Sequence, residues 1–190
     1  MVNDEVERLA LLINNLLSIT QIEMGTLNLN RTRTRLADLV NDAVQSVSRS
    51  AGDKQLRFSV DVPSDELAVQ IDKELMRIAL NNLLTNAVKY SDDGGVVRVA
   101  VSETDESLQR SVTDTGIGIP EQERDRIFEK FVRGEGDEVS KRTGHGLGLA
   151  LSRDIVELHH GNLRVQSKVG AGSKFTIELW KHLGVMEQAI

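Results

Sequence analysis

Apolar residues recur at helical spacing near the start of the chain. The repeating positions are Val2, Val6, Leu9, Ile13 and Leu16, with Leu12 and Ile19 beside them. This period predicts a helix over residues 2–24, of the kind that forms coiled coils and helical bundles. Gly25 follows at a position where helices commonly end. The pattern leaves two interpretations open: a helix that docks on the rest of the chain, or one that belongs to a longer bundle.

Alternating and helical patterns then follow one another along the rest of the chain. Period-two alternation predicts strands at residues 26–35, 56–62, 67–72, 94–103, 107–114, 162–168 and 172–180. Helical spacing predicts helices at residues 36–47, 72–90, 120–131 and 147–160. Several predicted strands are neighbours in sequence, so we expect an α+β fold. It would be a two-layer α/β sandwich in which helices cover one face of a mixed sheet.

The predicted helix at 72–90 carries polar residues in line with its buried positions. At about 100° per residue, Asn82, Asn86 and Lys89 fall on the same side as Leu75. A buried amide without a hydrogen-bond partner costs about 1–3 kcal/mol. These side chains must therefore meet polar protein groups or a bound ligand.

Composition narrows the possible functions. The 190 residues are 39% hydrophobic, enough for one main domain, and 23 Lys and Arg against 29 Asp and Glu give a net charge of -6. This balance argues against nucleic acid and anionic membranes as partners. The absence of cysteine excludes a disulfide framework and a thiolate metal site. No apolar run approaches 18 residues, and most of the 15 glycines fall between positions 116 and 172.

The stretch DTGIGIP at residues 114–120 places a carboxylate at the end of an apolar strand, before a Gly-x-Gly turn. The glycines allow close approach of a ligand, and the carboxylate of Asp114 can accept a hydrogen bond from an exocyclic amine. An Asx turn that ends the strand is the alternative interpretation.

A second glycine-rich stretch, TGHGLGLAL at residues 143–151, runs straight into a predicted helix. Backbone amides at a helix N-terminus suit a phosphate, although a hinge without a ligand explains the glycines too. The stretch matches neither a P-loop nor a dinucleotide fingerprint. The polar segment before it, residues 134–146, predicts a mobile loop or lid. GAGSKF at residues 170–175 reads as a tight turn between the last two strands.

Taken in order, these stretches resemble the boxes of the catalytic ATP-binding domain of sensor histidine kinases, within the GHKL superfamily of ATPases and kinases. NLLTNAVKY at 82–90 is similar to the asparagine box, IFEKFVR at 127–133 to the phenylalanine box, and the three glycine stretches to the glycine boxes. The resemblance implies a Bergerat fold over residues 26–184 and a tail at 185–190. NNLLSITQIEMG further resembles the end of the second helix of a dimerisation and phosphotransfer bundle, which assigns residues 1–25 to that bundle.

The resemblance implies a role for each polar residue of the asparagine box. Asn86 would coordinate Mg²⁺ that bridges the phosphates of ATP, Asn82 would contact phosphate or the metal's waters, and Lys89 would neutralise phosphate charge. Tyr90 would pack near the ribose and phosphates. Arg133, after the phenylalanine box, is the candidate cation for the leaving phosphate.

The glycine boxes would form the base and phosphate sites. Asp114 would accept a hydrogen bond from the adenine amine and so select ATP over GTP. The remaining implied contacts are Gly116, Gly118 and Ile119 around the base, and Gly144, Gly146, Leu147 and Gly148 around the phosphates and base. Phe128 and Phe131 are expected to anchor the lid, His145 to be incidental, and His159 and His160 to lie at a solvated helix end.

Two departures from the family pattern shape the expected activity. None of the four histidines is followed by Glu or Asp in the way the family's phosphoacceptor is, so the acceptor would lie outside this chain. Related ATPases carry a general-base Glu four residues before the metal-binding Asn, where this sequence has Asn82. An amide cannot act as a general base, so hydrolysis should be slow.

We therefore expect a histidine kinase domain that transfers the γ-phosphate of ATP to a histidine on a helical bundle. Further expected partners are the receiver domain of a response regulator and a second copy in the full-length protein. The expected location is cytoplasmic, including as the cytoplasmic part of a membrane-bound sensor. The alternatives are a non-catalytic nucleotide-binding module, an ATP-driven clamp and a kinase that phosphorylates serine.

Overall fold

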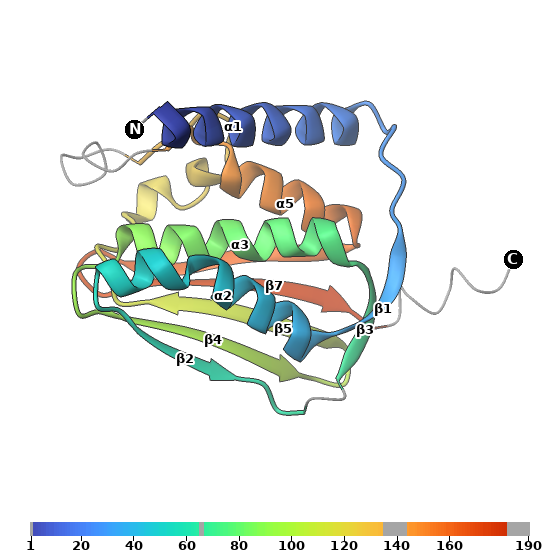
Figure 1. Cartoon of the computed structure of the whole chain (residues 1–190). Helices are drawn as coiled ribbons and strands as arrows, with labels where there is room; N and C mark the ends of the chain where they lie inside the picture. Colours follow the sequence, from blue (N-terminus) through green and yellow to red (C-terminus); the bar gives the residue numbers. More distant parts are fainter. Residues whose placement is uncertain (1, 65–66, 135–143, 182–190) are drawn as a thin grey trace, which may run out of the picture.

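A computed structural model describes residues 2–64, 67–134 and 144–181 (Figure 1). Its helices are α1 (Val2–Glu23), α2 (Leu36–Asp53), α3 (Lys73–Tyr90) and α5 (Gly148–Leu158), with short 3-10 helices η1 (Glu121–Glu123) and η2 (Arg126–Phe128). Its strands are β1 (Arg31–Arg35), β2 (Arg57–Asp61), β3 (Ala68–Asp72), β4 (Val96–Glu103), β5 (Ser107–Asp114), β6 (Gly161–Lys168) and β7 (Gly172–Trp180).

Five strands form one mixed sheet in the order β2-β4-β5-β7-β6. Only the β2–β4 pair is parallel, whereas β4–β5, β5–β7 and β6–β7 are antiparallel. Helices α2, α3 and α5 lie side by side over one face of this sheet (Figure 1). The expected two-layer α/β sandwich is confirmed. The remaining strands, β1 and β3, pair antiparallel in a separate small sheet at one end of the helical layer.

The core fills the space between the helical layer and the sheet. Helix α3 lies in its centre and contributes seven buried apolar side chains, namely Met76, Ala79, Leu80, Leu83, Leu84, Ala87 and Val88. Fully burying a side chain of the size of Leu83 contributes roughly 1.5–3 kcal/mol. The helix begins at Asp72, whose side chain accepts a hydrogen bond of 3.1 Å from the backbone N–H of Leu75. This packing fixes the helix that carries the asparagine box.

Three predicted elements differ from the structure. The helix expected at 120–131 is replaced by η1 and η2, because few apolar side chains of this charged segment reach the core and only Phe128 is buried. The strand expected at 26–35 shortens to β1, since only that part pairs with β3. Helix α2 continues beyond residue 47 to Asp53, with Ala51 still buried against the core.

Helix α1 packs beside α5 but leaves most of its apolar stripe uncovered. Ile19 is 2% exposed, and Leu12 and Ile22 pack against the core. Along the rest of the stripe, Val6, Leu9, Ile13 and Leu16 remain 47–60% exposed. The side of α1 that packs on the rest of the chain therefore differs from the side that carries the predicted apolar repeat. No helix within the described residues is long and apolar enough to cross a membrane.

Candidate functional site

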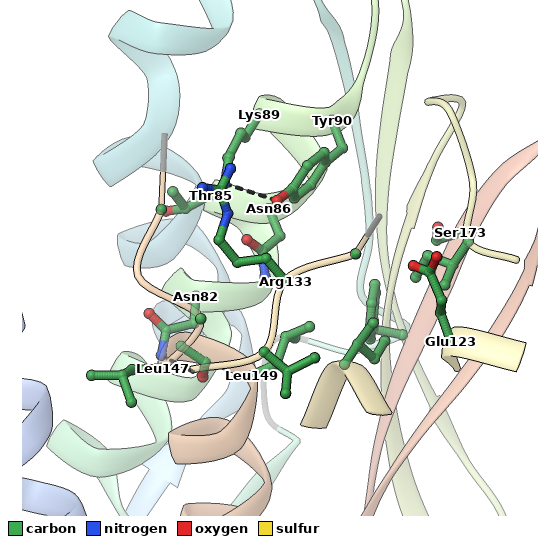
Figure 2. A pocket seen from close by; sticks show the side chains of 18 of the residues that line it. Asn82, Thr85, Asn86, Lys89, Tyr90, Glu123, Arg133, Leu147, Leu149 and Ser173 are labelled. Atoms are coloured by element: carbon green, nitrogen blue, oxygen red, sulfur yellow. Dashed lines mark hydrogen bonds between the residues drawn. The ribbon is translucent and has the colours of Figure 1, made fainter. Parts of the chain in front are cut away.

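A cavity of about 360 Å³ opens between α3, the start of α5 and the loops that follow β5 and η2. Every residue that the sequence predicts for the site lines this cavity except Gly116. They are Asn82, Asn86, Lys89, Tyr90, Asp114, Gly118, Ile119, Arg133, Gly144, Gly146, Leu147 and Gly148. Figure 2 shows the side chains of Asn82, Asn86 and Lys89 along α3, with Arg133 close to the last two.

Asp114 lies at the end of β5 and is almost fully buried in the wall of the cavity. Its Oδ1 accepts hydrogen bonds from the backbone N–H of Gly116 at 2.9 Å and of Ser173 at 3.3 Å. Burial raises the pKa of the Asp114 carboxyl, and these two hydrogen bonds oppose that shift. Within the described residues no protein group bonds Oδ2. The carboxylate is thus held by one oxygen, and the other can accept from a ligand.

Positions 116 and 118 require glycine, because backbone atoms lie too close to leave room for a Cβ. A Cβ on Gly116 would lie 2.3 Å from the carbonyl oxygen of Tyr90, so this glycine brings the loop against the end of α3. Gly118 has a φ of +72°, and a Cβ there would lie 2.1 Å from the carbonyl oxygen of Lys168. Gly116 supports the site from behind Asp114, while Gly118 is part of the cavity wall.

Lys89 and Arg133 bring positive charge to the opposite part of the lining. The ammonium of Lys89 donates to the hydroxyl of Tyr90 at 2.8 Å and lies 4.5 Å from the centre of its ring (Figure 2). A Cβ on Gly144 would lie 2.6 Å from Nζ of Lys89, so the ammonium rests against the glycine-rich loop. An anionic group beside this loop would meet both cations.

Asn82 meets polar partners from the protein, as its position on a half-buried face requires. Its Nδ2 donates to the backbone carbonyl of Gly148 at 3.0 Å and to Oγ of Ser152 at 3.3 Å. The amide therefore joins the middle of α3 to the first turn of α5. Asn86, one turn further along α3, is half-buried and lines the cavity.

The cavity also includes residues that the sequence did not indicate. Asn15 comes from α1, which is far away in sequence and gave no sign of facing the site. Ser173 and Phe175 belong to the GAGSKF stretch, which resembles a glycine box but from which no individual site residue was predicted. Glu123, the last residue of η1, completes the wall near Ser173 (Figure 2).

The two phenylalanines of the phenylalanine box behave differently. Phe128 is buried and meets the ring of Phe175 edge to face, with 6.4 Å between ring centres. Its apolar side chain is thus fixed in the core, while its role as an anchor of the lid stays a prediction. The prediction for Phe131 is wrong, because its side chain is 66% exposed. Phe131 has a φ of +64°, and its backbone N–H donates to the carbonyl of Gly146 at 2.9 Å. Its backbone, rather than its ring, contacts the glycine box.

His159 does not lie at a solvated helix end, and that prediction is wrong. The side chain is 8% exposed, and its Nε2 accepts a hydrogen bond of 3.0 Å from the backbone N–H of Asp72. Burial lowers the pKa of His159, which favours the neutral ring. His160 is exposed as expected, and His145 is an exposed residue at the rim of the cavity. The predicted mobile lid falls mainly on residues 135–143, which lie outside the described residues.

Comparison with known proteins places these features in a family. A family model described as histidine kinase-, DNA gyrase B-, and HSP90-like ATPase matches residues 71–183, which is more than half of the chain. The chain belongs to this family. The match includes Asn82 and Asn86 of α3, Asp114 and all three glycine stretches.

Individual relatives confirm the resemblance to the ATP-binding domains of sensor histidine kinases. The adaptive-response sensory kinase SasA of Synechococcus sp. (strain JA-3-3Ab) is 34% identical over 176 residues, which cover 92% of this chain and 46% of the relative. The chain thus spans less than half of that protein. A structure of full-length ShkA in complex with AMPPNP is 27% identical with a TM-score of 0.80, covering 93% of this chain and 36% of that one. The mycobacterial sensor histidine kinase MprB is 30% identical with a TM-score of 0.69, covering 79% and 97%.

Proposed function

We propose that this chain binds ATP and supplies the catalytic domain of a histidine kinase, which transfers the γ-phosphate to a histidine on a helical bundle. One observation carries the proposal. A single cavity joins the buried carboxylate of Asp114, whose Oδ2 is bonded by none of the described residues, to the cations Lys89 and Arg133 beside a glycine-rich loop. This pairing of an amine acceptor with an anion site fits the two ends of an adenine nucleotide. ShkA, whose structure contains AMPPNP, shares the fold over most of this chain.

The base would be selected by the carboxylate of Asp114. Adenine presents an exocyclic amine that can donate to Oδ2, whereas guanine presents a carbonyl at that place. Two facing acceptors would remain unpaired in a desolvated site, which costs about 1–3 kcal/mol. Gly118 and Ile119 would form the adjoining surface of the base pocket, with Gly116 supporting it from behind.

The phosphates would lie against Lys89, Arg133 and the glycine-rich loop. Gly144, Gly146, Leu147 and Gly148 would present backbone amides and apolar surface there. Because the described residues hold no cluster of three or more His, Asp or Glu side chains, a metal ion would take most of its ligands from phosphate and water. The amide oxygen of Asn86 fits such a site, because Mg²⁺ prefers oxygen ligands and retains several waters. Bound Mg²⁺ would neutralise charge on the transferring phosphoryl group.

In the proposed reaction a ring nitrogen of the acceptor histidine attacks the γ-phosphorus and the bond to the β-phosphate oxygen breaks. The products are a phosphohistidine and ADP. Lys89 and Arg133 would stabilise the charge that develops on the leaving phosphate, and the cavity would orient the nucleotide. Neither residue needs to transfer a proton.

Transfer to a side chain is favoured over hydrolysis because Asn82 cannot activate water. An amide is not a general base, and its Nδ2 is already bonded to Gly148 and Ser152. An ATP-driven clamp needs such a base and is therefore the less favoured alternative. A non-catalytic nucleotide-binding module remains the second candidate, because the acceptor histidine does not occur in this sequence in the expected context.

The proposal includes partners and a place in a larger protein. Residues 1–25 would be the end of the second bundle helix, 26–184 the ATP-binding domain and 185–190 a tail. The exposed apolar stripe of α1 would face the rest of the bundle, and the full-length protein would be a homodimer. A response regulator receiver domain would take the phosphoryl group from the histidine. The location would be cytoplasmic, as in kinases that signal through such regulators.

Two measurements test the proposal. Calorimetric titration should show saturable binding of ATP in the presence of Mg²⁺, weaker binding after the metal is removed with EDTA, and no competition by GTP. Incubation with γ-labelled ATP and a bundle fragment that carries the acceptor histidine should then give an acid-labile phosphoprotein. Binding without any labelled bundle would favour the non-catalytic module. Steady release of phosphate by the chain alone would favour the clamp.

A further inference from the structure

Lys54 donates hydrogen bonds to three backbone carbonyls at the end of α3. Its Nζ lies 3.0 Å from the carbonyl oxygens of Val88 and Lys89 and 2.8 Å from that of Ser91. Lys54 itself follows directly after α2, the neighbouring helix. One ammonium group thus spans the gap between two helices and uses each of its three N–H groups on a carbonyl.

These bonds satisfy groups that a helix leaves without partners. The last four carbonyls of an α-helix have no intrahelical donor and carry the negative end of its dipole. In α3, Ala87 is bonded by the N–H of Ser91, and Tyr90 by the N–H of Ile117 at 3.2 Å. Lys54 satisfies the two carbonyls between them. The end of α3 is therefore held by α2 on one side and by the loop after β5 on the other.

The same turn of α3 carries the phosphate end of the cavity. Lys89 and Tyr90 line the cavity with their side chains, while their carbonyls are bonded to Lys54 and Ile117. A Cβ on Gly116 would also lie only 2.3 Å from the carbonyl oxygen of Tyr90, so the loop with Gly116 packs directly on this turn. A shift of this turn by a few tenths of an ångström would move Lys89 against the glycine-rich loop and disturb the base pocket as well.

We propose that Lys54 is a positioning residue for nucleotide binding: it fixes the last turn of α3 so that Lys89 and Tyr90 meet the phosphates. Lys54 does not line the cavity and touches no substrate. Its positive charge also lies at the negative end of the dipole of α3, where a cation is favourable. This inference rests on the proposed function, because it assigns a second residue to the same nucleotide site.

A matched control separates positioning from general support. Lys73 also joins α2 to α3, through an ion pair of 3.3 Å with Asp42, but at the opposite end of α3 from the cavity. Lys54→Met and Lys73→Met therefore remove the same charge from the same pair of helices. Lys54→Arg keeps the charge and the donors, and tests whether these are what the site requires.

The experiment compares the affinities for ATP with Mg²⁺ and for adenosine by calorimetric titration and competition, together with the melting temperature. In Lys54→Met the ratio of ATP to adenosine affinity should fall about tenfold, because only ATP uses the misplaced cation. The ratio should stay unchanged in Lys73→Met, and in Lys54→Arg it should be close to that of the unsubstituted chain. A lower melting temperature with an unchanged ratio in Lys54→Met would overturn the inference, as would an equal fall in Lys73→Met.

Two further outcomes are distinguishable. If Lys54→Met does not fold, Lys54→Gln takes its place, because glutamine removes the charge and has at most two of the three donors, so the ratio should again fall. If the unsubstituted chain binds neither ligand, the proposed function fails and the inference about Lys54 fails with it. If the unsubstituted chain binds ATP and the Lys54 variants keep its ratio of affinities, only the inference about Lys54 is overturned.

Discussion

The backbone N–H of Asp72 donates a hydrogen bond of 3.0 Å to Nε2 of His159. The other ring nitrogen, Nδ1, lies 2.7 Å from the carbonyl oxygen of Ile155 and can donate to it only as N–H. The ring is thus used as a neutral acceptor and donor at once. It ties the start of α3 to the end of α5, the two helices whose opposite ends line the cavity.

This arrangement predicts that stability falls in mild acid. The folded state lowers the pKa of His159 through burial, whereas an unfolded histidine has a pKa of about 6.5. The unfolded chain then binds more protons than the folded one. The stability that neutral His159 contributes is therefore complete above about pH 6.5 and is lost as the pH falls toward the lower folded pKa. Arg31 and Arg110 lower this pKa further, while the bond to Ile155 and the charge of Asp72 oppose the shift.

Melting temperatures between pH 8 and pH 5 check this prediction. His159→Gln should be less stable at pH 8 and should show a flatter profile, because its side chain does not titrate. His160→Asn is the matched control, since the neighbouring histidine is exposed and asparagine tolerates its φ of +55°. An unchanged slope in His159→Gln, or an equally flat one in His160→Asn, would contradict the assignment.

Replacement of the buried Arg110 by an apolar residue is predicted to stabilise the fold. Arg110 stands on β5 between Val101 of β4 and Ile177 of β7, and it is 1% exposed. Its guanidinium nitrogens have no hydrogen-bond partner among the described residues, and burial lowers its pKa to about 10. Arg110→Met removes this buried charge at similar length, and we expect a gain of about 2 kcal/mol in the free energy of unfolding.

Urea unfolding of Arg110→Met checks the sign of the change. Arg98→Met is the control, because Arg98 is exposed and pairs at the surface with Asp61 at 2.9 Å. Loss of an exposed pair should change stability by no more than about 0.5 kcal/mol. A destabilised Arg110→Met would mean that the guanidinium has partners that its described surroundings do not reveal.

Asp114→Asn should lose ATP binding without losing stability. The pKa of Asp114 is raised in the folded state, so its charged form is penalised there and stability falls as the pH rises through the folded pKa. Asparagine removes that charge, and its Oδ1 can still accept from Gly116 and Ser173. Its NH₂ group, however, would face the adenine amine as a second donor. The expected result is an equal or higher melting temperature at pH 7 with no detectable binding of ATP.

Binding and unfolding have to be measured on the same preparation of Asp114→Asn. A fall in melting temperature together with lost binding would assign Asp114 a structural role at the end of β5. Retained binding of ATP would remove Asp114 from the base pocket altogether.

Local patterns predicted the parts of the site that lie within single stretches of sequence. Asn82, Asn86 and Lys89 share one face of α3, and their helical spacing places them together in any fold that forms this helix. Burial of a side chain by residues distant in the sequence could not be predicted in this way. His159 lies at a helix end, where solvent is the usual environment, but it is buried where Asp72 at the end of β3 bonds its ring.

Charged segments were the second source of error. The spacing in residues 120–131 fits a helix, but Phe128 alone is buried, and a helix with little apolar contact gains too little from packing to form. Asn15 gave no signal, because the sequence does not show which edge of α1 meets α5. The sequence showed the apolar repeat of α1, which is largely exposed. Only the structure shows that the side around Ile19 is the one that packs on the rest of the chain.

Two glycines in the same backbone conformation allow the cost of a clash to be separated from the cost of the conformation. Gly118 has a φ of +72° and Gly170 a φ of +74°. A Cβ on Gly170 would meet no heavy atom within 4 Å, whereas a Cβ on Gly118 would lie 2.1 Å from the carbonyl oxygen of Lys168. Gly170→Ala should therefore cost only the left-handed strain of about 1–2 kcal/mol.

Gly118→Ala should cost clearly more and should weaken ATP binding, because the loop must move away from Lys168 and takes the wall of the base pocket with it. Urea unfolding gives the difference in free energy, and calorimetric titration gives the affinity of each variant at a temperature where both are folded. Gly170→Ala should keep its affinity for ATP. Equal losses of stability in the two variants, with binding intact in both, would show that the contact between Gly118 and Lys168 neither shapes the pocket nor restricts the loop.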